Sequence, residues 1–381
     1  MGDEWQMINQ ARMLAEFLEL VKIKCSTKEE RQAADFLKPR LTALNLEVSE
    51  DDAAAKFGGN CGNILAYLKG NVPAAPVILL NAHLDCVEPC ENIQPQIKDG
   101  IISSAGDTIL GSDDKAGVAA ILEALRILKE QNLPHGDIQV VFTVGEESGL
   151  NGSKNLDRQL LRADFGYSLD AGGTPGEIIT MAPGQNSINA TIHGKTAHAG
   201  VAPEEGINAI VVAGKAIAAL KQGRLDFETT ANVGIIRGGR ATNIVPDTVE
   251  VFCEARSRNL DKLAAQTAHM RETFEQIAQA NGARAEVTVS SAYNPFVLEE
   301  NSAVVSLAVQ AAKCIGLLPD VKATGGGSDA NFFNAYGVPT AVLGVGMSKV
   351  HTTEEFIKEA DLYAAARLVL AIIQAAAEKQ K

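Results

Sequence analysis

Apolar positions recur along the first half of the chain with two different spacings. Residues 7–22 and 28–44 carry apolar side chains at helical spacing, which predicts two opening helices. Beyond them, short apolar runs alternate with one longer helical pattern. The predicted strands span residues 64–68, 77–80, 138–144 and 165–169, and the predicted helix spans residues 115–130. Strands that alternate with helices indicate an α/β fold with a mostly parallel sheet and helices on both faces.

The pattern changes between about residues 186 and 292. Strands are predicted there at 187–193, 230–236, 249–255 and 285–290, and helices at 207–220 and 260–281. This order is typical of a small α+β domain. A buried strand at 340–345 and a closing helix at 360–377 follow. Because 381 residues exceed what one core usually supports, we expect a larger domain over residues 1–185 and 293–381, with residues 186–292 inserted as a smaller one.

Composition narrows the possible partners. Hydrophobic residues make up 46% of the chain, and the net charge of −13 disfavours nucleic acid and anionic membranes but favours cations. Residues 1–5 are acidic and lack the features of a secretory signal, and no apolar run reaches the roughly 18 residues of a membrane span. The six dispersed cysteines are typical of reduced thiols. We therefore expect a cytoplasmic protein that binds neither nucleic acid nor membrane.

Acidic and imidazole side chains lie at the ends of the predicted strands and in the loop just before the long helix. They are His83, Asp85, Asp113, Asp114, Glu146, Glu147, Asp170 and His351. Ligand sites of open α/β sheets form at the carboxyl ends of the strands, so these groups can converge although they lie far apart in sequence. The sequence therefore predicts one carboxylate-rich site at this edge of the sheet.

Such a site favours metal-assisted hydrolysis. Several carboxylates in one place repel one another unless cations neutralise them. The mixture of imidazole and carboxylate suits zinc, cobalt or manganese better than calcium. Two ions that share a carboxylate would lie roughly 3.5 to 4 Å apart and hold a hydroxide between them. In the adjacent pair Glu146 and Glu147, one carboxylate can bind metal while the other reaches the water.

Five short motifs, in this order, resemble those of the dizinc metallopeptidases related to peptidase T and glutamate carboxypeptidase, most closely the peptidase T-like members. The motifs are His83–Asp85, Gly111–Gly117, Gly145–Gly149, Leu169–Gly172 and Val350–Thr352. They span nearly the whole chain. The resemblance implies a hydrolase with two divalent ions and an inserted lid domain used for dimerisation.

The resemblance also implies roles for these side chains. The metal ligands would be His83, Asp113, Glu147, Asp170 and His351. His83 and Asp170 would bind one ion, Glu147 and His351 the other, and Asp113 would bridge the two. Glu146 would be the general base, and Asp85 would orient the ring of His83 from behind.

Residues of the inserted domain resemble the family's substrate-binding groups. His198 would stabilise the oxyanion, in some members from the partner subunit. Asn243 and Arg256 would hold a substrate carboxylate, a task that suits the planar guanidinium. Gly326, in the run 325–327, would line the substrate where the backbone approaches it closely.

The leading hypothesis is a peptidase T-like aminopeptidase that cleaves short peptides such as tripeptides, using a metal-activated water with Glu146 as base. The same centre also suits an N-acyl amino acid deacylase, a dipeptidase or a carboxypeptidase, and a metal-dependent binding protein without turnover is a further alternative. His198 could belong to a simple turn, Asn243 could cap one, and Arg256 could form an exposed ion pair. We expect a homodimer through the lid domain.

Overall fold

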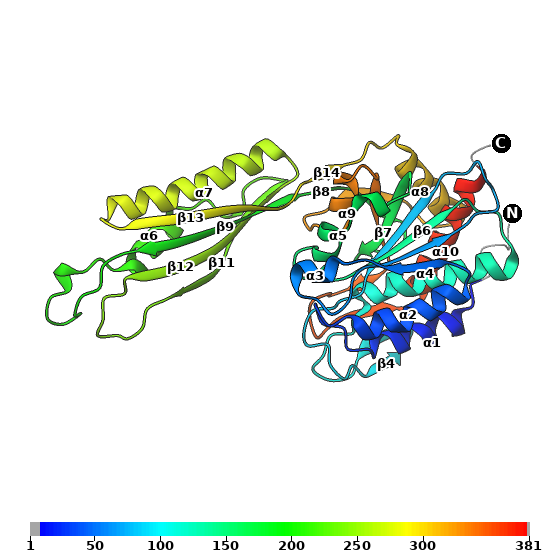
Figure 1. The fold of residues 1–381 in the computed structure, drawn as a ribbon, viewed down its shortest axis with the longest axis horizontal. Coiled ribbons are helices and arrows are strands. Elements are labelled where there is room, and N and C mark those ends of the chain that lie inside the picture. Colours follow the sequence, from blue (N-terminus) through cyan, green and yellow to red (C-terminus); the bar gives the residue numbers. More distant parts are fainter. Residues whose placement is uncertain (1–7, 379–381) are drawn as a thin grey trace. The chain divides into compact units, whose positions relative to one another are not determined.

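The computed structural model describes residues 8–378, so the acidic start, residues 1–5, lies outside the described part. The chain forms two compact units, and each is considered by itself. Unit 1 comprises Met1–Thr180, Leu298–Ala323 and Ser328–Lys381, and unit 2 comprises Met181–Val297 and Thr324–Gly327. Figure 1 labels many of the elements of both. The assignment of these parts as catalytic and lid domains stays a prediction.

A sheet with a parallel centre forms the middle of unit 1. Its parallel strands, in order, are β6 (Ile138–Thr143), β3 (Ile78–His83), β7 (Phe165–Ala171) and β16 (Thr340–Gly344). These strands are buried at almost every position, as expected for a parallel sheet that helices cover. The predicted α/β fold with a mostly parallel central sheet is confirmed.

The outer strands of this sheet differ from the predicted pattern because they pair antiparallel. The antiparallel strands are β2 (Ile64–Leu68) and β1 (Glu47–Glu50) beside β6, and β8 (Glu177–Ala182) beside β16. Strand β15 (Asp320–Ala323) pairs with the other edge of β8. Antiparallel neighbours need no crossover helix between them, so the central parallel order does not extend to these strands.

Helices pack against the sheet and against one another. Those of unit 1 are α1 (Gln10–Val21), α2 (Arg31–Ala43), α3 (Ala53–Phe57), α4 (Ser112–Gln131), α5 (Asn151–Asn155), α8 (Ala303–Cys314), α9 (Ala330–Ala335) and α10 (Glu359–Glu378). Helix α4 packs on β3, β7 and α10, while Phe333 of α9 packs with Leu79 and Val141 in a separate cluster. Among the described helices, α10 alone is long and apolar enough by length and composition to cross a membrane, and 67% of that stretch is buried inside the protein.

A small second sheet in unit 1 was not predicted. It runs in the order β17 (Met347–Ser348), β18 (Phe356–Lys358), β5 (Ile101–Ser104) and β4 (Pro95–Lys98), all antiparallel. These strands are too short to give a clear sequence pattern. The loop between β17 and β18 carries His351, so this sheet positions one of the candidate ligands.

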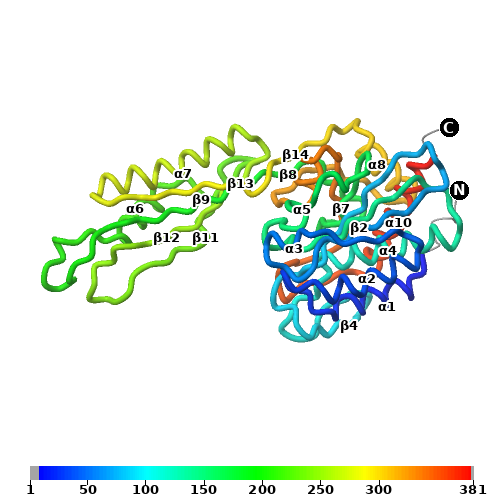
Figure 2. Tube along the Cα trace, viewed as in Figure 1, coloured from blue at the N-terminus to red at the C-terminus, as the bar shows by residue number. Residues whose placement is uncertain are grey.

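Unit 2 is an antiparallel sheet with helices on one face. Its strands, in spatial order, are β10 (Gly223–Arg224), β11 (Thr229–Gly238), β12 (Thr248–Ser257), β9 (Gly184–His193) and β13 (Arg284–Tyr293), and β14 (Phe296–Val297) pairs with the end of β8. Alternate residues of the strands, such as Ile188 and Val251, pack under α6 (Ala209–Ala219) and α7 (Leu260–Ala280). Figure 2 traces α7 along this sheet. The α+β pattern expected for this part is confirmed.

Candidate metal centre

The candidate ligands of unit 1 gather where the parallel strands end. His83 is the last residue of β3, Asp170 lies near the end of β7, and Glu146 and Glu147 follow β6 after a turn. Gly145 has φ +62° in that turn, a left-handed conformation that glycine adopts without strain. The strand ends therefore supply carboxylates and an imidazole to one edge of the sheet.

Asp113 stands between two histidines. Its Oδ1 lies 3.1 Å from His83 Nε2 and its Oδ2 lies 3.4 Å from His351 Nε2. His83 Nε2 is also 3.6 Å from Asp170 Oδ1, and His351 Nε2 is 3.0 Å from Glu147 Oε2. Among the described residues, potential ligand atoms of His83, Asp113 and Asp170 lie within 4.8 Å of one another, as do those of Asp113, Glu147 and His351. The structure thus brings the five predicted ligands into two sets that share Asp113.

The ring of His83 is held in one orientation. Its Nδ1 lies 2.9 Å from the backbone carbonyl oxygen of Asp85 but 3.7 Å from the nearer carboxylate oxygen of the same residue. A carbonyl oxygen only accepts, so Nδ1 carries a proton, and Nε2, which faces Asp113 and Asp170, is the nitrogen that would bind a metal. Asp85 does orient the ring, but through its main chain rather than through the carboxylate that the sequence suggested.

The carboxylate of Asp85 instead holds the loop that carries the candidate base. It accepts hydrogen bonds from the backbone N–H groups of Glu146 (2.9 Å) and Glu147 (3.2 Å) and from the hydroxyl of Thr27 (2.6 Å). Glu146 is itself buried, and a carboxylate oxygen of Glu146 lies within 4.8 Å of potential ligand atoms of His83 and Glu147. Glu146 therefore lies beside the two ligand sets on a loop fixed from behind.

The site carries excess negative charge away from water. Burial raises the pKa of Asp170 to about 7, and burial together with the nearby Asp170 and Asp329 raises the pKa of Glu146 well above its usual value. Hydrogen bonds to Asp113 and Glu147 raise the pKa of His351 to about 10. Such shifts mark a site that a bound cation would neutralise.

The donor atoms fit a pair of divalent ions. Oε1 of Glu147 is buried and has no hydrogen-bond partner among the described residues, which is costly unless a ligand takes it up. Each set combines one imidazole nitrogen with two carboxylates, a combination that suits zinc, cobalt or manganese. The residues present therefore fit the metal chemistry that the motifs imply.

Buried carboxylates around the centre carried no predicted role. Asp329 accepts hydrogen bonds from the hydroxyls of Thr143 and Ser153, and Oε1 of Glu30 accepts from the backbone N–H groups of Lys28 (2.9 Å) and Gly145 (3.0 Å). Glu355 accepts from the loop that contains Asp113. The sequence could have indicated two of these residues, because Asp329 ends the glycine-rich run and Glu355 lies four residues after His351. No motif of the predicted site lies next to Glu30.

His198 lies in unit 2, in the loop after β9, and is exposed. Its Nδ1 accepts hydrogen bonds from the backbone N–H groups of Gly200 and Val201, both at 3.2 Å. With Nδ1 as acceptor, the neutral ring carries its proton on Nε2 and can donate it outward. Asn243 lies beside it, since its carbonyl oxygen accepts from the backbone N–H of Ala199 at 3.0 Å. The structure thus brings His198 and Asn243 together.

Arg256 lies at the other end of the same sheet. It stands opposite Gln185, near the start of β9, while His198 lies beyond the last residue of that strand, His193. At about 3.3 Å per residue, Gln185 and His193 are about 26 Å apart. The guanidinium of Arg256 pairs with Glu254 through Nε (2.9 Å) and Nη2 (3.0 Å). Within unit 2, the structure therefore does not bring Arg256 and His198 together.

The glycine run is constrained at one position in particular. A Cβ on Gly327 would lie 2.4 Å from the ring of Tyr293, whereas a Cβ on Gly326 would meet its nearest neighbour, Thr324 Oγ1, at 4.0 Å. Gly326 is exposed. Contacts within unit 2 therefore account for glycine at 327, and a close approach of substrate at Gly326 stays a prediction.

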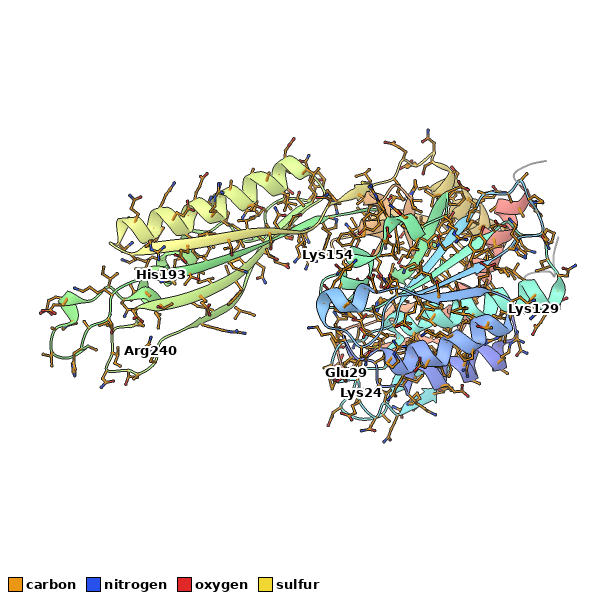
Figure 3. All side chains as sticks on the ribbon, viewed as in Figure 1. Lys24, Glu29, Lys129, Lys154, His193 and Arg240 are labelled. Atoms are coloured by element: carbon orange, nitrogen blue, oxygen red, sulfur yellow. The ribbon has the colours of Figure 1, made fainter. Side chains whose placement is uncertain are left out.

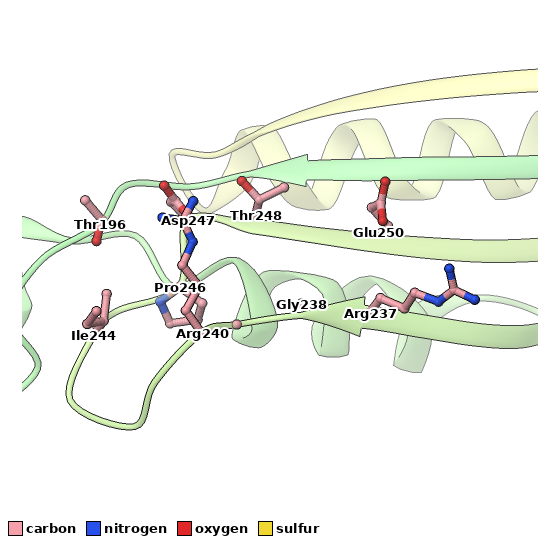
Figure 4. A pocket seen from close by; sticks show the side chains of 10 residues that line it. Thr196, Arg237, Gly238, Arg240, Ile244, Pro246, Asp247, Thr248 and Glu250 are labelled. Atoms are coloured by element: carbon pink, nitrogen blue, oxygen red, sulfur yellow. The ribbon is translucent and has the colours of Figure 1, made fainter.

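An open hollow of about 320 Å³ adjoins the loops of His198 and Asn243 (Figure 4). It is lined by Thr196, Arg237, Gly238, Gly239, Arg240, Ile244, Pro246, Asp247, Thr248 and Glu250. Figure 3 labels His193 at the end of β9 and Arg240 in the loop between β11 and β12. The lining mixes both signs of charge, so the hollow alone selects no class of ligand.

Comparison with known proteins shows which family the chain matches. The model of peptidase family M20/M25/M40 matches residues 79–375. The uncharacterized protein YqjE of Bacillus subtilis strain 168 is 45% identical over 372 residues, covering 98% of this chain and 100% of that protein. These matches include every candidate ligand.

Two solved structures are similar in sequence and fold. Aminopeptidase PepT from Bacillus cereus ATCC 10987 has 48% identity and a TM-score of 0.90, covering 98% of this chain and 100% of that one. A tripeptidase from Staphylococcus aureus Mu50 has 46% identity and a TM-score of 0.94, covering 97% and 99%. The similarity thus extends over both units.

Proposed function

Because the chain belongs to peptidase family M20/M25/M40, as its motifs suggested, we propose that it is a metal-dependent aminopeptidase that removes the N-terminal residue from short peptides such as tripeptides. The observation that carries this proposal is the position of Asp113 between two ligand sets, with the buried carboxylate of Glu146 beside them. The names of the Bacillus cereus and Staphylococcus aureus relatives support the choice of substrate.

The five ligands divide into two ion sites. His83 and Asp170 would hold one ion, Glu147 and His351 the other, and Asp113 both. Zinc fits these donors, with cobalt or manganese as alternatives. When bound, the ions supply positive charge that polarises the scissile carbonyl and makes water more acidic.

Glu146 would move the protons of the reaction. Its carboxylate, beside both ligand sets, would accept a proton from the attacking water and then pass it to the leaving amine. Asp85 holds the backbone of this loop through the N–H groups of Glu146 and Glu147. The loop therefore keeps the base in place while its charge changes.

The separation within unit 2 supports a homodimer. An extended tripeptide spans only about 10 Å, whereas Gln185, opposite Arg256, and His193, before the loop of His198, are about 26 Å apart along β9. One substrate is therefore too short to contact both Arg256 and His198 of the same unit 2. If both groups act on one peptide, His198 and Asn243 come from the partner subunit. Exposed apolar side chains on α6 and β11, such as Val211 (50% exposed) and Ile236 (50%), fit a subunit interface there.

We place the protein in the cytoplasm. All six cysteines lie within the described residues, and all are free thiols. Reduced thiols are typical of proteins in a reducing compartment. This part of the proposal is independent of the metal chemistry.

A substrate panel tests the proposed activity. The zinc-loaded protein is incubated with a tripeptide, its N-acetylated form, its C-amidated form, a dipeptide and an N-acyl amino acid. We expect release of the N-terminal residue from the free tripeptide and no cleavage of the N-acetylated one. Cleavage of only the N-blocked compounds would contradict the aminopeptidase proposal and favour a deacylase.

A further inference from the structure

Glu355 lies under the loop that carries the shared ligand Asp113. Its side chain is 1% exposed. Oε2 accepts hydrogen bonds from the backbone N–H groups of Leu110 (2.9 Å) and Gly111 (2.8 Å). Oε1 accepts from the hydroxyl of Ser112 (2.5 Å) and the backbone N–H of Asp113 (3.1 Å). One buried carboxylate thus gathers the donors of consecutive residues up to the ligand itself.

The local backbone explains why this carboxylate is needed. Gly111 has φ +72°, and Asp113 has φ −83° and ψ 106°, so the segment leading into α4 is not helical. Its N–H groups are buried and lack helical partners, and unpaired buried N–H groups are costly. An ionised carboxylate offers about four acceptor positions and no donor, which matches the four bonds found within the described chain.

Glu355 also belongs to the loop of a second ligand. It lies four residues after His351, between β17 and β18, and its own N–H donates to the carbonyl oxygen of Thr352 at 3.1 Å. Asp113 and His351 are members of the same ligand set with Glu147. The side chain of Glu355 therefore connects the backbone of Asp113 with the loop that carries His351, although the two ligands come from distant parts of the sequence.

We propose that Glu355 is a positioning residue that sets the spacing between Asp113 and His351 and thereby the affinity of the ion site formed by Asp113, Glu147 and His351. This inference rests on the metal centre proposed above. Glu355 is not a ligand, because both of its oxygens are occupied by the Asp113 loop. Residues that hold metal ligands in this way typically contribute 10- to 100-fold to metal affinity.

Glu355→Gln tests the proposal without changing the size of the side chain. If the new amide nitrogen replaces Oε2, it faces two backbone N–H donors. If it replaces Oε1, it faces the N–H of Asp113, while the hydroxyl of Ser112 can turn to accept. Either orientation leaves at least one donor facing another donor. We expect zinc affinity at this site to fall 10- to 100-fold, with a smaller change at the site of His83 and Asp170.

The matched control is Glu123→Gln. Glu123 is a fully buried carboxylate on α4 that accepts from the N–H of Asn9 and from Arg12, and it contacts none of the proposed ligands. Zinc is titrated calorimetrically into the metal-free forms of the wild type and both variants, and their thermal midpoints are measured without metal. We expect both variants to lose stability but only Glu355→Gln to lose zinc affinity.

The outcomes separate this inference from the proposed function. If the wild type binds fewer than two zinc ions, the metal centre and this inference both fail. If the wild type binds two and Glu355→Gln binds them equally well, or if Glu123→Gln loses as much affinity, only the role of Glu355 is overturned. If Glu355→Gln does not fold, Ser112→Ala removes a single donor to Glu355. We expect zinc affinity at the same site to fall several-fold in that variant. Unchanged affinity there would overturn the proposal.

Discussion

The metal centre of unit 1 and the His198–Asn243 loops of unit 2 are built in opposite ways. In the centre, His83, Asp85 and Glu146 are buried, and Asp85 accepts hydrogen bonds from several donors. In unit 2, His198 and Asn243 are exposed, and the bonds that hold the ring of His198 come from its own turn. The centre is therefore pre-organised by the fold of unit 1, whereas the His198–Asn243 loops are exposed within unit 2.

This difference assigns different kinds of work to the two regions. Groups that change charge during a reaction need fixed positions in a site with little water. Groups that recognise a substrate or a partner subunit must remain accessible until it arrives. Substitutions in the centre should therefore abolish chemistry or metal binding, and substitutions in unit 2 should weaken catalysis or binding while the ions stay in place.

Glu146→Gln should have the largest effect on turnover. We expect tripeptide hydrolysis to fall by about 10³-fold, because general base catalysis contributes roughly 10²- to 10⁴-fold, while both ions remain bound. Turnover and metal content are measured on the same sample. Glu147→Gln is the control, since it should lose metal as well as activity. Full activity in Glu146→Gln would show that Glu146 is not the general base.

His198→Ala should have the next largest effect on turnover. We expect kcat to fall about 10²- to 10³-fold, because this is the usual contribution of one oxyanion donor, while both ions remain bound. Mixing this variant with Glu146→Gln locates the donor. If His198 acts across a dimer, mixed dimers contain one intact site, and random exchange should restore about a quarter of the wild-type activity by the symmetry of the pair. A mixture as inactive as its components would place His198 in its own subunit.

The buried carboxyl group of Glu30, next to the metal centre, should make the stability of the fold depend on pH. Burial, with the nearby Asp85, raises the pKa of Glu30 from 4.5 to about 7, so the folded protein loses stability as the pH rises through this range and Glu30 ionises. Oε2 of Glu30 has no partner among the described residues, so the amide of Glu30→Gln can replace it while Oε1 keeps both of its bonds.

Denaturant unfolding of the metal-free wild type and of Glu30→Gln, at pH 5 and pH 8, measures this effect. We expect similar stability at pH 5 and an advantage of about 1 to 3 kcal/mol for the variant at pH 8. An advantage that is the same at both pH values would show that ionisation of Glu30 is not its source.

Arg256→Ala should have the smallest effect. We expect KM for a tripeptide to rise about tenfold, equivalent to about 1.4 kcal/mol, with kcat nearly unchanged and no rise for the C-amidated peptide. This follows if the guanidinium edge not used by Glu254 binds the substrate carboxylate. An equal rise in KM for both peptides would leave Arg256 with only its ion pair to Glu254.

The sequence predicted the centre better than its supports. His83, Glu146 and Asp170 follow strong strand patterns, and the order of the motifs connects them with Asp113 and His351. The antiparallel edge strands and the β17–β18 loop come from short segments that have no clear period.

Contacts between residues far apart in the sequence could not be predicted either. Glu355 meets Leu110 across 245 positions, and no local pattern records such a contact. The acceptor to which His83 Nδ1 points is the backbone carbonyl rather than the carboxylate of Asp85, and this choice depends on backbone geometry that residue types do not encode. The distance between Arg256 and His198 became visible only once the register of β9 was known.

If unit 1 holds two metal ions that share Asp113, crystals grown with zinc and measured at the zinc absorption edge should contain two anomalous peaks about 3.5 to 4 Å apart. We expect one peak beside His83 and Asp170 and the other beside Glu147 and His351, with Asp113 between them. A single peak, or zinc bound only in unit 2, would contradict this expectation.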